Sequence, residues 1–563
     1  MCLRHPLPVQ RACRNCAEHP ACGTQRLVST DTPATNSGAE PLAWAGLFAA
    51  IALSRASVAP EILFDWDAAN YALGLSDYDV FNHRPHPPGS PVLMLLWKAA
   101  AHLFDPVMAM VSVNIVLSCG TVATVGSMAR PTLGRLGAWL LGLCLACCPL
   151  FWMHGALTTA YVAEGFTSVG VAALGAAVLR GSLRLELAAV GWALLLGLRP
   201  NGLLTLTPLM AFVAWHRPTN LARAVTAGAV VILGWSLPMV AESGGLGAWR
   251  QATSALSAWQ FKVGSALAGD FSAALRNLES LAMFLADAAN IALLAMLCLV
   301  ARRPQPSLLQ LGFAASWLAP ATLYYVLHHL PKAGYALTLV PAMFLGLALI
   351  ARAMPRFALA LSAIYIAANS MFFVTAVPPE AVIYGDAPEL VPDRAVVAGD
   401  FSIRGMAYRT RPLRTLQQEL DKSAELDRAM VFLTGAHELH RLSMAAFPEV
   451  PSVAVFVEHG TSWSTHDETS FGEWQLEVLG SPKLRGTDRS PTTVRWDGTT
   501  LTLERLGDRL MRPLDAARIL VVYPCDPCVM SNAGPADASG IVELGAGYRA
   551  TWLNRPVRRR PKN

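Results

Sequence analysis

The stretch from Phe64 to Pro91 concentrates ionisable side chains between two apolar segments. Its sequence is FDWDAANYALGLSDYDVFNHRPHPPGSP, and it holds four aspartates, two histidines and one arginine. An acid in such a place can act as a general base toward an acceptor hydroxyl, or as a metal ligand. Charged groups are costly to bring toward hydrocarbon. The concentration therefore predicts a reaction site rather than a simple connector.

Asp67 is the first candidate for the base, and Asp65 is the second. Both lie among Phe64, Trp66 and Tyr71. Aromatic neighbours remove water from a carboxylate, which predicts a raised pKa. A helix N-cap is the alternative role for any aspartate of this stretch.

The second half of the stretch offers hydrogen-bond donors. His83, Arg84 and His86 lie in NHRPHPPG, where the prolines restrict the backbone that presents them. Such side chains suit phosphate oxygens, so this segment is predicted to face a phosphate. Asp77 and Asp79 are expected to be structural.

Three later turns carry further polar groups. Glu164 begins an apolar segment, and an acid at such a depth indicates a site role, with a hydrogen-bonded structural acid as the alternative. Arg199 interrupts two short apolar segments and is expected to face a polar cavity. His329 and Lys332 lie in HHLPKAGY, where a phosphate site and interfacial snorkelling are both open. Arg55, near the end of the first apolar segment, is expected to snorkel.

The elements that position these groups are predicted to be membrane helices. Of the 563 residues 53% are hydrophobic and 15% charged, and the mean hydropathy is +0.39, which excludes an ordinary soluble protein. The net charge of +5 is dispersed, so no nucleic-acid partner is expected. Windows of about 19 apolar residues predict eleven spans: 42–62, 107–128, 136–153, 159–179, 186–198, 202–215, 222–240, 280–301, 308–328, 333–352 and 357–376.

The apolar run 90–104 decides the topology. It is short, contains Lys98 and follows Pro87-Pro88-Gly89. If it does not cross, five arginine pairs share the side of the N-terminus and obey the positive-inside rule; it is therefore predicted to be re-entrant or interfacial. The pairs are Arg130/Arg135, Arg180/Arg184, Arg217/Arg223, Arg302/Arg303 and Arg352/Arg356.

This topology divides the chain into three parts. Residues 42–376 form the transmembrane domain, with exterior loops 63–106 and 242–279. The second loop is too polar to span, and it either anchors the chain at the interface or roofs a groove for a lipid substrate. Residues 377–563 alternate short β-type runs with helical stretches, which predicts an exterior α/β or α+β domain.

The cysteines predict no disulfide framework. Cys13 and Cys16 begin a C-x2-C pattern that suggests zinc, but the second ligand pair is missing. Residues 1–41 are therefore expected to be either a disordered cytoplasmic leader or residues added by a wrongly chosen start codon. Cys525 and Cys528 form a CxxC motif, for which a local disulfide is expected, with a redox site as the alternative.

The loop motif also carries a resemblance. FDWDAANYALGLSDYDV followed by HRPHPPGSP resembles the first exterior loop of the GT-C superfamily, in the branch of protein O-mannosyltransferases and the lipid A aminoarabinose transferase. PLFWMHGALTTAYVAEGF, GLRPNGLLTLTPL and HHLPKAGYALTLVPA follow in the same order. The similar region covers roughly 42–350.

The resemblance implies an enzyme that moves a sugar from a polyprenyl-phosphate-linked donor to an envelope acceptor, which is a protein, lipid or polysaccharide. It implies a reaction at the exterior face of the cytoplasmic membrane, while the arginine pairs predict that the N-terminus lies inside. The loop acid of the family falls on Asp67, with Asp65 as the alternative, its HPP element on His86-Pro87-Pro88 and its second acid on Glu164. Relatives often carry Asp at that last position, which leaves the use of Mg or Mn by Asp67 and Glu164 open, and no cofactor is certain.

The mechanism expected from these residues is one direct displacement that inverts the anomeric centre. Asp67 accepts the proton of the acceptor, while fixed cations stabilise the leaving phosphate. The phosphate-binding candidates are Arg84, His86, His83, Arg199, His329 and Lys332. The substrate-lining candidates are Trp66, Asn70, Tyr71, Tyr161 and Tyr335.

Two other classes of protein are alternatives. A transporter or lipid flippase should show an inverted repeat and ionisable groups at the midplane, whereas this sequence has no repeat and places its polar groups on one face. A non-catalytic membrane anchor does not need polar residues inside several apolar segments.

Overall fold

The computed structural model describes residues 39–290, 307–330, 332–375, 402–422, 428–433 and 436–457, followed by short pieces, mainly strands, between 476 and 554. Several predicted features lie outside these residues: most of the leader with Cys13 and Cys16, the arginines at 302 and 303, and the CxxC motif at 525–528.

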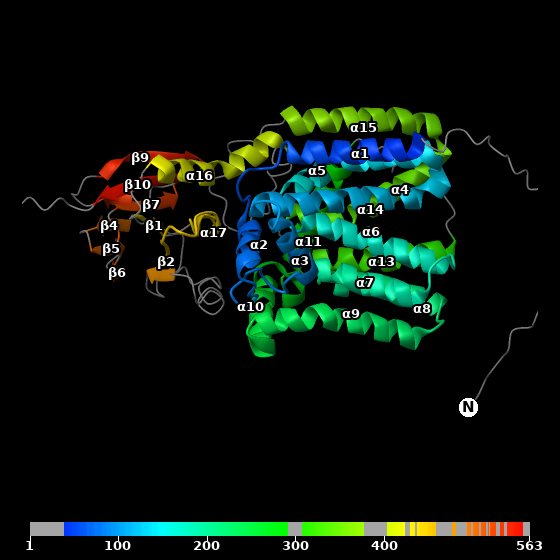
Figure 1. The fold of residues 1–563 in the computed structure, drawn as a ribbon, viewed down its shortest axis with the longest axis horizontal. Helices are drawn as coiled ribbons and strands as arrows, with labels where there is room; N and C mark the ends of the chain where they lie inside the picture. Colours follow the sequence, from blue (N-terminus) through cyan, green and yellow to red (C-terminus); the bar gives the residue numbers. More distant parts are fainter. Residues whose placement is uncertain are drawn as a thin grey trace, which may run out of the picture.

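Most of the described chain is a bundle of roughly parallel helices (Figure 1). Four of them, α4, α6, α9 and α15, are long and apolar enough to cross a membrane, and α3, α7, α8 and α14 are shorter apolar helices. The chain is an integral membrane protein. The bundle helices are α1 (Ala39–Ala56), α4 (Pro106–Ala146), α5 (Pro149–Ala156), α6 (Tyr161–Leu179), α7 (Leu185–Leu198), α8 (Gly202–His216), α9 (Leu221–Glu242), α13 (Leu308–Leu327), α14 (Val340–Ala353) and α15 (Pro355–Thr375).

Some predicted spans differ in detail from the helices observed. The predicted spans 107–128 and 136–153 meet in α4, whose backbone leaves helical geometry only at Gly134, with φ 69° and ψ −173°. This positive φ suits glycine, which carries no Cβ. The predicted span 333–352 begins as a 3-10 helix, η2 (Ala333–Thr338), and becomes α-helical at Val340.

Four helices lie at the end of the bundle that faces the C-terminal domain (Figure 1): α2 (Trp66–Ser76), α3 (Pro91–Ala101), α10 (Gly245–Gly264) and α11 (Phe271–Ala289). At 1.5 Å per residue the 11 residues of α3 reach about 16 Å, roughly half of a hydrocarbon core. This agrees with the prediction that 90–104 does not cross. Segment 242–279, which was predicted not to span, is mostly helical and forms α10 and the first part of α11.

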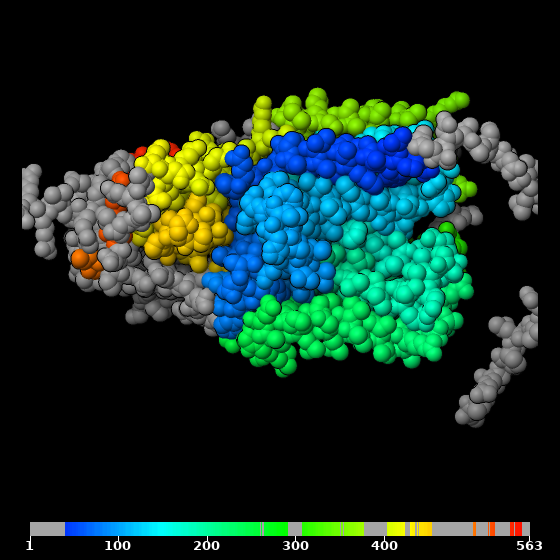
Figure 2. Space-filling model, viewed as in Figure 1, coloured from blue at the N-terminus to red at the C-terminus, as the bar shows by residue number. Residues whose placement is uncertain are grey.

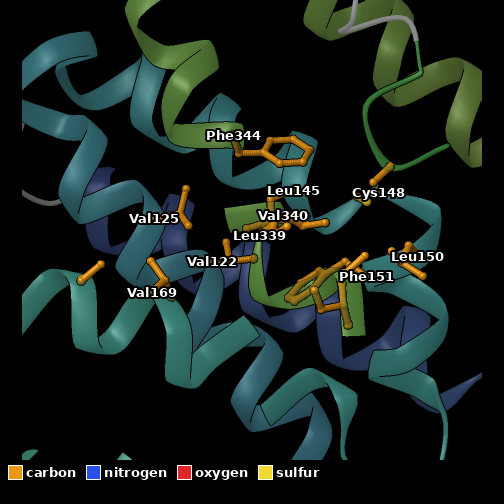
Figure 3. Packing of buried hydrophobic residues seen from close by; sticks show 14 of the residues in the cluster. Val122, Val125, Leu145, Cys148, Leu150, Phe151, Val169, Leu339, Val340 and Phe344 are labelled. Atoms are coloured by element: carbon orange, nitrogen blue, oxygen red, sulfur yellow. The ribbon is translucent and has the colours of Figure 1, made fainter. Parts of the chain in front are cut away.

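The core of the bundle is a continuous apolar cluster (Figure 3). Val122 and Val125 of α4 pack with Phe151 of α5, Val169 of α6 and Phe344 of α14, and all five are fully buried. Contacts of this density fix the spacing of the helix ends. The side chains that project from those ends therefore hold defined positions.

Arg55 also lies within the packed bundle. Its side chain is 2% exposed, donates to the Ala146 carbonyl at 2.5 Å and lies 5.2 Å from the ring centroid of Trp152. The prediction that Arg55 snorkels is therefore wrong, because a helix C-terminal carbonyl and an aromatic face within the protein solvate its charge.

In the described residues of the C-terminal domain, two helices accompany two sheets. The first sheet has the order β3-β2-β1-β7-β10-β9, with parallel pairing from β3 to β7 and antiparallel pairing of β10 with its neighbours, and the second has the order β6-β5-β4-β8. This confirms a C-terminal domain that contains both helices and sheets. The elements are α16 (Ile403–Lys422), β1 (Arg428–Phe432), α17 (His437–Ala446), β2 (Ser452–Val457), β3 (Leu476–Leu479), β4 (Thr492–Trp496), β5 (Thr500–Arg505), β6 (Asp508–Pro513), β7 (Arg518–Pro524), β8 (Met530–Ala533), β9 (Ala538–Gly545) and β10 (Tyr548–Asn554).

The core of this domain extends into the polar stretch that follows α1. Leu63, Ala68 and Ala69 belong to the same buried cluster as Leu439 and Leu442 of α17. Figure 2 shows this stretch, in blue, between the yellow helices of the C-terminal domain and the rest of the bundle. Helix α2 is therefore held by both parts of the molecule.

Candidate active site

Asp65 sets the start of α2. Its backbone is extended and its Oδ1 accepts a hydrogen bond from the Ala68 amide at 2.9 Å, so it is the N-cap. The capping role that the sequence left open for these aspartates falls on Asp65. Asp67 then lies in the first turn of α2, and its carboxylate does not serve as the cap.

Lys332 joins the two aspartates. Its Nζ lies 2.8 Å from Oδ2 of Asp65 and 2.8 Å from Oδ2 of Asp67. Tyr161, at the start of α6, donates its hydroxyl to the same Oδ2 of Asp67 at 2.9 Å, and His86 Nδ1 lies 3.8 Å from Oδ1 of Asp67. Three segments far apart in the sequence thus meet at one carboxylate: the stretch 64–91, the start of α6 and the turn before η2.

These neighbours set the pKa of Asp67. Burial acts to raise it, but the charge of Lys332 and the hydrogen bonds from Lys332 and Tyr161 together hold the pKa of Asp67 well below its usual range. The prediction of a raised pKa is wrong, because the sequence shows the aromatic neighbours but not the lysine. Burial acts to lower the pKa of Lys332, and the two aspartates outweigh it, so the pKa of Lys332 lies well above its usual value. Burial lowers the pKa of His86, so that side chain is neutral at pH 7.

A second polar cluster lies beneath the first. Arg199 contacts Glu164 Oε1 through Nε at 2.7 Å and through Nη2 at 2.5 Å, and its Nη1 donates to the Tyr71 hydroxyl at 3.1 Å. The guanidinium also lies 5.7 Å from the ring centroid of Tyr161. Glu164 and Arg199 are each 4% exposed, and Thr338 Oγ1 lies 3.5 Å from Glu164 Oε2. The ion pair therefore fixes the two tyrosines that flank Asp67.

Solved structures with this arrangement of elements are known. ArnT from Cupriavidus metallidurans bound to undecaprenyl phosphate matches with a TM-score of 0.57 and 13% identity, over 90% of this chain and 98% of that chain. The apo state of the same protein matches with a TM-score of 0.57 and 13% identity, over 91% and 98%. The chain has the GT-C fold. This confirms, for the fold, the resemblance that the loop motif indicates. No family model and no curated protein sequence matches the chain.

Within this GT-C fold, exposure separates the predicted residues into two groups. Lys332, His86 and Asp67 expose 35%, 19% and 17% of their side chains, and Trp66 and Tyr335 are also partly exposed. These five can touch a substrate. The other group is buried and holds the first in place: Tyr71, Tyr161, Glu164 and Arg199.

Asn70 and His83 do not face the cluster, contrary to the prediction. Asn70 is fully buried and its Oδ1 accepts a hydrogen bond from Arg441 at 2.7 Å, so it does not line a substrate site. His83 is buried, and its carbonyl accepts from Arg441 Nη2 at 3.1 Å. Neither contact was visible in the sequence, because Arg441 belongs to the C-terminal domain.

Arg84 lies in a local ion pair. Its Nη1 contacts Asp77 Oδ2 at 2.7 Å, while Asp79 accepts from the amides of Phe81 and Asn82 and exchanges backbone hydrogen bonds with Arg84. Asp77 and Asp79 are structural, as predicted. Arg84 is a fixed part of the same turn.

His329 lies beside His328, with 6.4 Å between ring centroids. Burial, together with His328, lowers the pKa of His329 to about 4. At pH 7 it can offer a hydrogen bond but no positive charge. Lys332 is therefore the cation that this turn presents.

His154 was missed in the sequence. It is 6% exposed at the end of α5, its ring lies edge-on to Tyr161 with 5.1 Å between centroids, and its Nδ1 lies 3.4 Å from Thr159 Oγ1. The sequence offered one signal for His154: it lies ten residues before Glu164, in HGALTTAYVAEGF.

The predicted metal ligands do not fit a shared ion. Asp67 contacts Lys332 and Glu164 contacts Arg199, so each carboxylate is already paired with a cationic side chain. Within the part of the chain that the structure describes, no group of three or more His, Cys, Asp or Glu side chains could hold a metal ion.

Proposed function

We propose that this chain is a glycosyltransferase that moves a sugar from a polyprenyl-phosphate-linked donor to an envelope acceptor. The observation that carries the proposal is the Asp67–Lys332 pair, a base candidate and a cation in contact at one end of an apolar helix bundle. A base beside a phosphate-binding cation is what transfer from a sugar phosphate requires. The GT-C fold, shared with an ArnT structure that holds undecaprenyl phosphate, supports the same class of donor.

In the proposed reaction the acceptor hydroxyl attacks the anomeric carbon. The new carbon–oxygen bond forms as the bond to the donor phosphate breaks, and the electron pair leaves with that phosphate. The hydroxyl proton passes to Asp67. A single displacement inverts the anomeric centre.

Lys332 links the two halves of this reaction. A bound phosphate at Lys332 competes with Asp67 for the ammonium, and the added negative charge opposes ionisation of the carboxylate. Asp67 is therefore expected to become a stronger base when the donor is present. His86, neutral and 3.8 Å from Asp67, is placed to donate a hydrogen bond to the same phosphate.

In this proposal Glu164 is not a catalytic acid and Arg199 does not bind phosphate, in contrast to the expectation from the sequence. Because they are buried and paired with each other, they act by positioning Tyr71 and Tyr161. Arg84, which is paired with Asp77, is assigned to the frame of the loop.

We also propose the orientation of the chain in the membrane from the distribution of arginines. Arg184 precedes α7, Arg217 follows α8, Arg352 lies in the last turn of α14, and Arg130 lies one turn before the break at Gly134 in α4. This distribution supports a cytoplasmic N-terminus. The cluster and residues 377–563 then lie on the exterior side of the cytoplasmic membrane.

The test uses purified protein in liposomes with polyprenyl-phosphate sugars that carry a labelled sugar. We expect release of polyprenyl phosphate and transfer of label to an envelope extract, both strongly reduced in Asp67→Asn. Equal release by the wild type and by Asp67→Asn would show that the assignment of the base is wrong. If no pentose or hexose donor released polyprenyl phosphate, the proposed activity would be wrong.

A further inference from the structure

Helix α17 of the C-terminal domain packs directly on α2, the helix that carries Asp67. Leu439 and Leu442 of α17 share one buried cluster with Ala68 and Ala69 of α2. The position of α2 therefore depends on the C-terminal domain, although the two helices are about 370 residues apart in the chain, as the Arg441–Asn70 contact shows.

Arg441 is the polar centre of this contact. Its side chain is fully buried. Nε donates to Asn70 Oδ1 at 2.7 Å, and Nη2 donates to the carbonyls of Asn82 and His83, each at 3.1 Å. The guanidinium also lies 5.9 Å from the ring centroid of Trp66. A charge buried in this way is costly unless its hydrogen bonds are made, so the geometry of the accepting oxygens is tightly specified.

The three accepting oxygens belong to two different arms of the active-site loop. Asn70 lies one helical turn after Asp67 on α2, whereas Asn82 and His83 lie in the turn that leads to His86. The backbone of His83 has a φ of 57°, a left-handed conformation that is unfavourable for a residue with a Cβ. The hydrogen bond to its carbonyl therefore helps to hold a conformation that the chain would not adopt by itself.

We propose that Arg441 is a positioning residue for the reaction: it fixes the arm that carries Asp67 against the arm that carries His86, and so makes the active-site geometry depend on the C-terminal domain. Only the kinetic test of this proposal depends on the function proposed above. The hydrogen bonds of Arg441 go to α2 and to the 82–83 turn, and its guanidinium lies beside Trp66 at the start of α2, so it acts through these two segments.

The kinetic arm compares Arg441→Ala, Arg441→Lys and the wild type. Small displacements of a catalytic group reduce turnover by roughly 10- to 100-fold, and we expect a fall in kcat of that size with little change in KM for the donor, because Lys332 is untouched. Added guanidinium is expected to restore part of the activity of Arg441→Ala, and methylammonium is not. Arg549→Ala is the matched control, since Arg549 forms an exposed ion pair with Glu543 in the same domain.

The second arm is hydrogen exchange, which needs no substrate and therefore separates this proposal from the proposed function. The amides of His83 and Arg84 donate to the carbonyls of Val80 and Asp79 and report on the turn. In Arg441→Ala these amides are expected to exchange faster, while those in the middle of α6 keep the wild-type rate. A variant that loses only yield or thermal stability, with wild-type kcat in the folded fraction and wild-type exchange in this turn, would overturn the proposal.

Discussion

The Nζ of Lys332 lies 2.8 Å from Oδ2 of Asp67, although 265 residues separate them in the chain. The contact brings the turn before η2 against the first turn of α2. The ammonium group stabilises the ionised form of the partly exposed Asp67 carboxylate, and the two aspartates stabilise the charged lysine. The properties of Asp67 therefore belong to the assembled bundle rather than to the loop in which it lies.

The first prediction separates the two aspartates. Asp67→Asn removes the proposed base, and general-base catalysis contributes roughly 10²- to 10⁴-fold, so transfer should fall by that factor. Asp65→Asn keeps a good N-cap residue and should retain more activity. Initial rates of polyprenyl phosphate release measure both variants. A greater loss in Asp65→Asn than in Asp67→Asn would reverse the assignment.

The second prediction concerns pH and Lys332. In the wild type the pKa of Asp67 is lowered, so its contribution to stability is present above the ordinary carboxyl pKa of about 4 and is lost as the pH falls below that value. In Lys332→Met burial remains without the cation, which raises the pKa of Asp67. Stability should then decrease as the pH rises from about 4 to 8.

Midpoints of thermal unfolding in detergent, measured across this pH range, test whether stability falls with rising pH in Lys332→Met and stays level in the wild type. Lys422→Met is the control, because Lys422 pairs with Glu419 on an exposed part of α16. A Lys332→Met curve parallel to that of the wild type would mean that the lysine does not control the carboxylate.

Much of the fold could be predicted because hydropathy is a local property. The bounds of α6, α7 and α9 fall within a few residues of the predicted spans, since each helix buries its own apolar side chains. A short helix at α3 could also be expected, because the apolar run 90–104 is itself short and contains Lys98. The 3-10 geometry of η2 was not predicted; its Gly334 lies close to Tyr161, a contact that the sequence does not display.

Four charged residues that the sequence singled out lie in two neighbouring ion pairs, but the pairing itself could not be predicted. The sequence singled out Asp67, Glu164, Arg199 and Lys332 because charged residues are rare in apolar surroundings. It could not show that Arg199 serves Glu164 while Lys332 serves Asp67. For the same reason the direction of the Asp67 pKa shift was predicted incorrectly.

The third prediction tests the buried pair of Glu164 and Arg199. Removing one partner leaves an uncompensated buried charge and costs about 3–5 kcal/mol, so Glu164→Gln and Arg199→Met should each lower the unfolding midpoint strongly. The double variant should be less destabilised than the sum, with a coupling of about 0.5–3 kcal/mol. Additive effects in a double-mutant cycle would contradict the pairing. Activity should stay low in all three, because Tyr71 loses its donor from Arg199 or the geometry that fixes it.

The last prediction uses two glycines of neighbouring elements. A Cβ on Gly334 in η2 would lie 2.2 Å from Cγ and 2.7 Å from Cβ of Tyr161, whereas a Cβ on Gly346 in α14 would meet nothing within 4 Å. Gly334→Ala must therefore displace Tyr161, whose hydroxyl donates to Asp67. Overpacking of this kind costs about 1–3 kcal/mol.

Gly346→Ala should instead be neutral or stabilising by up to about 1 kcal/mol, because alanine restricts the unfolded chain and suits a helix. Transfer rates and unfolding midpoints of the two variants are compared with the wild type. If Tyr161 positions the carboxylate, Gly334→Ala loses transfer in the protein that remains folded, and Gly346→Ala does not. A Gly334→Ala variant that is destabilised but transfers normally would leave Tyr161 a packing role alone, because its ring would then have moved without consequence for Asp67.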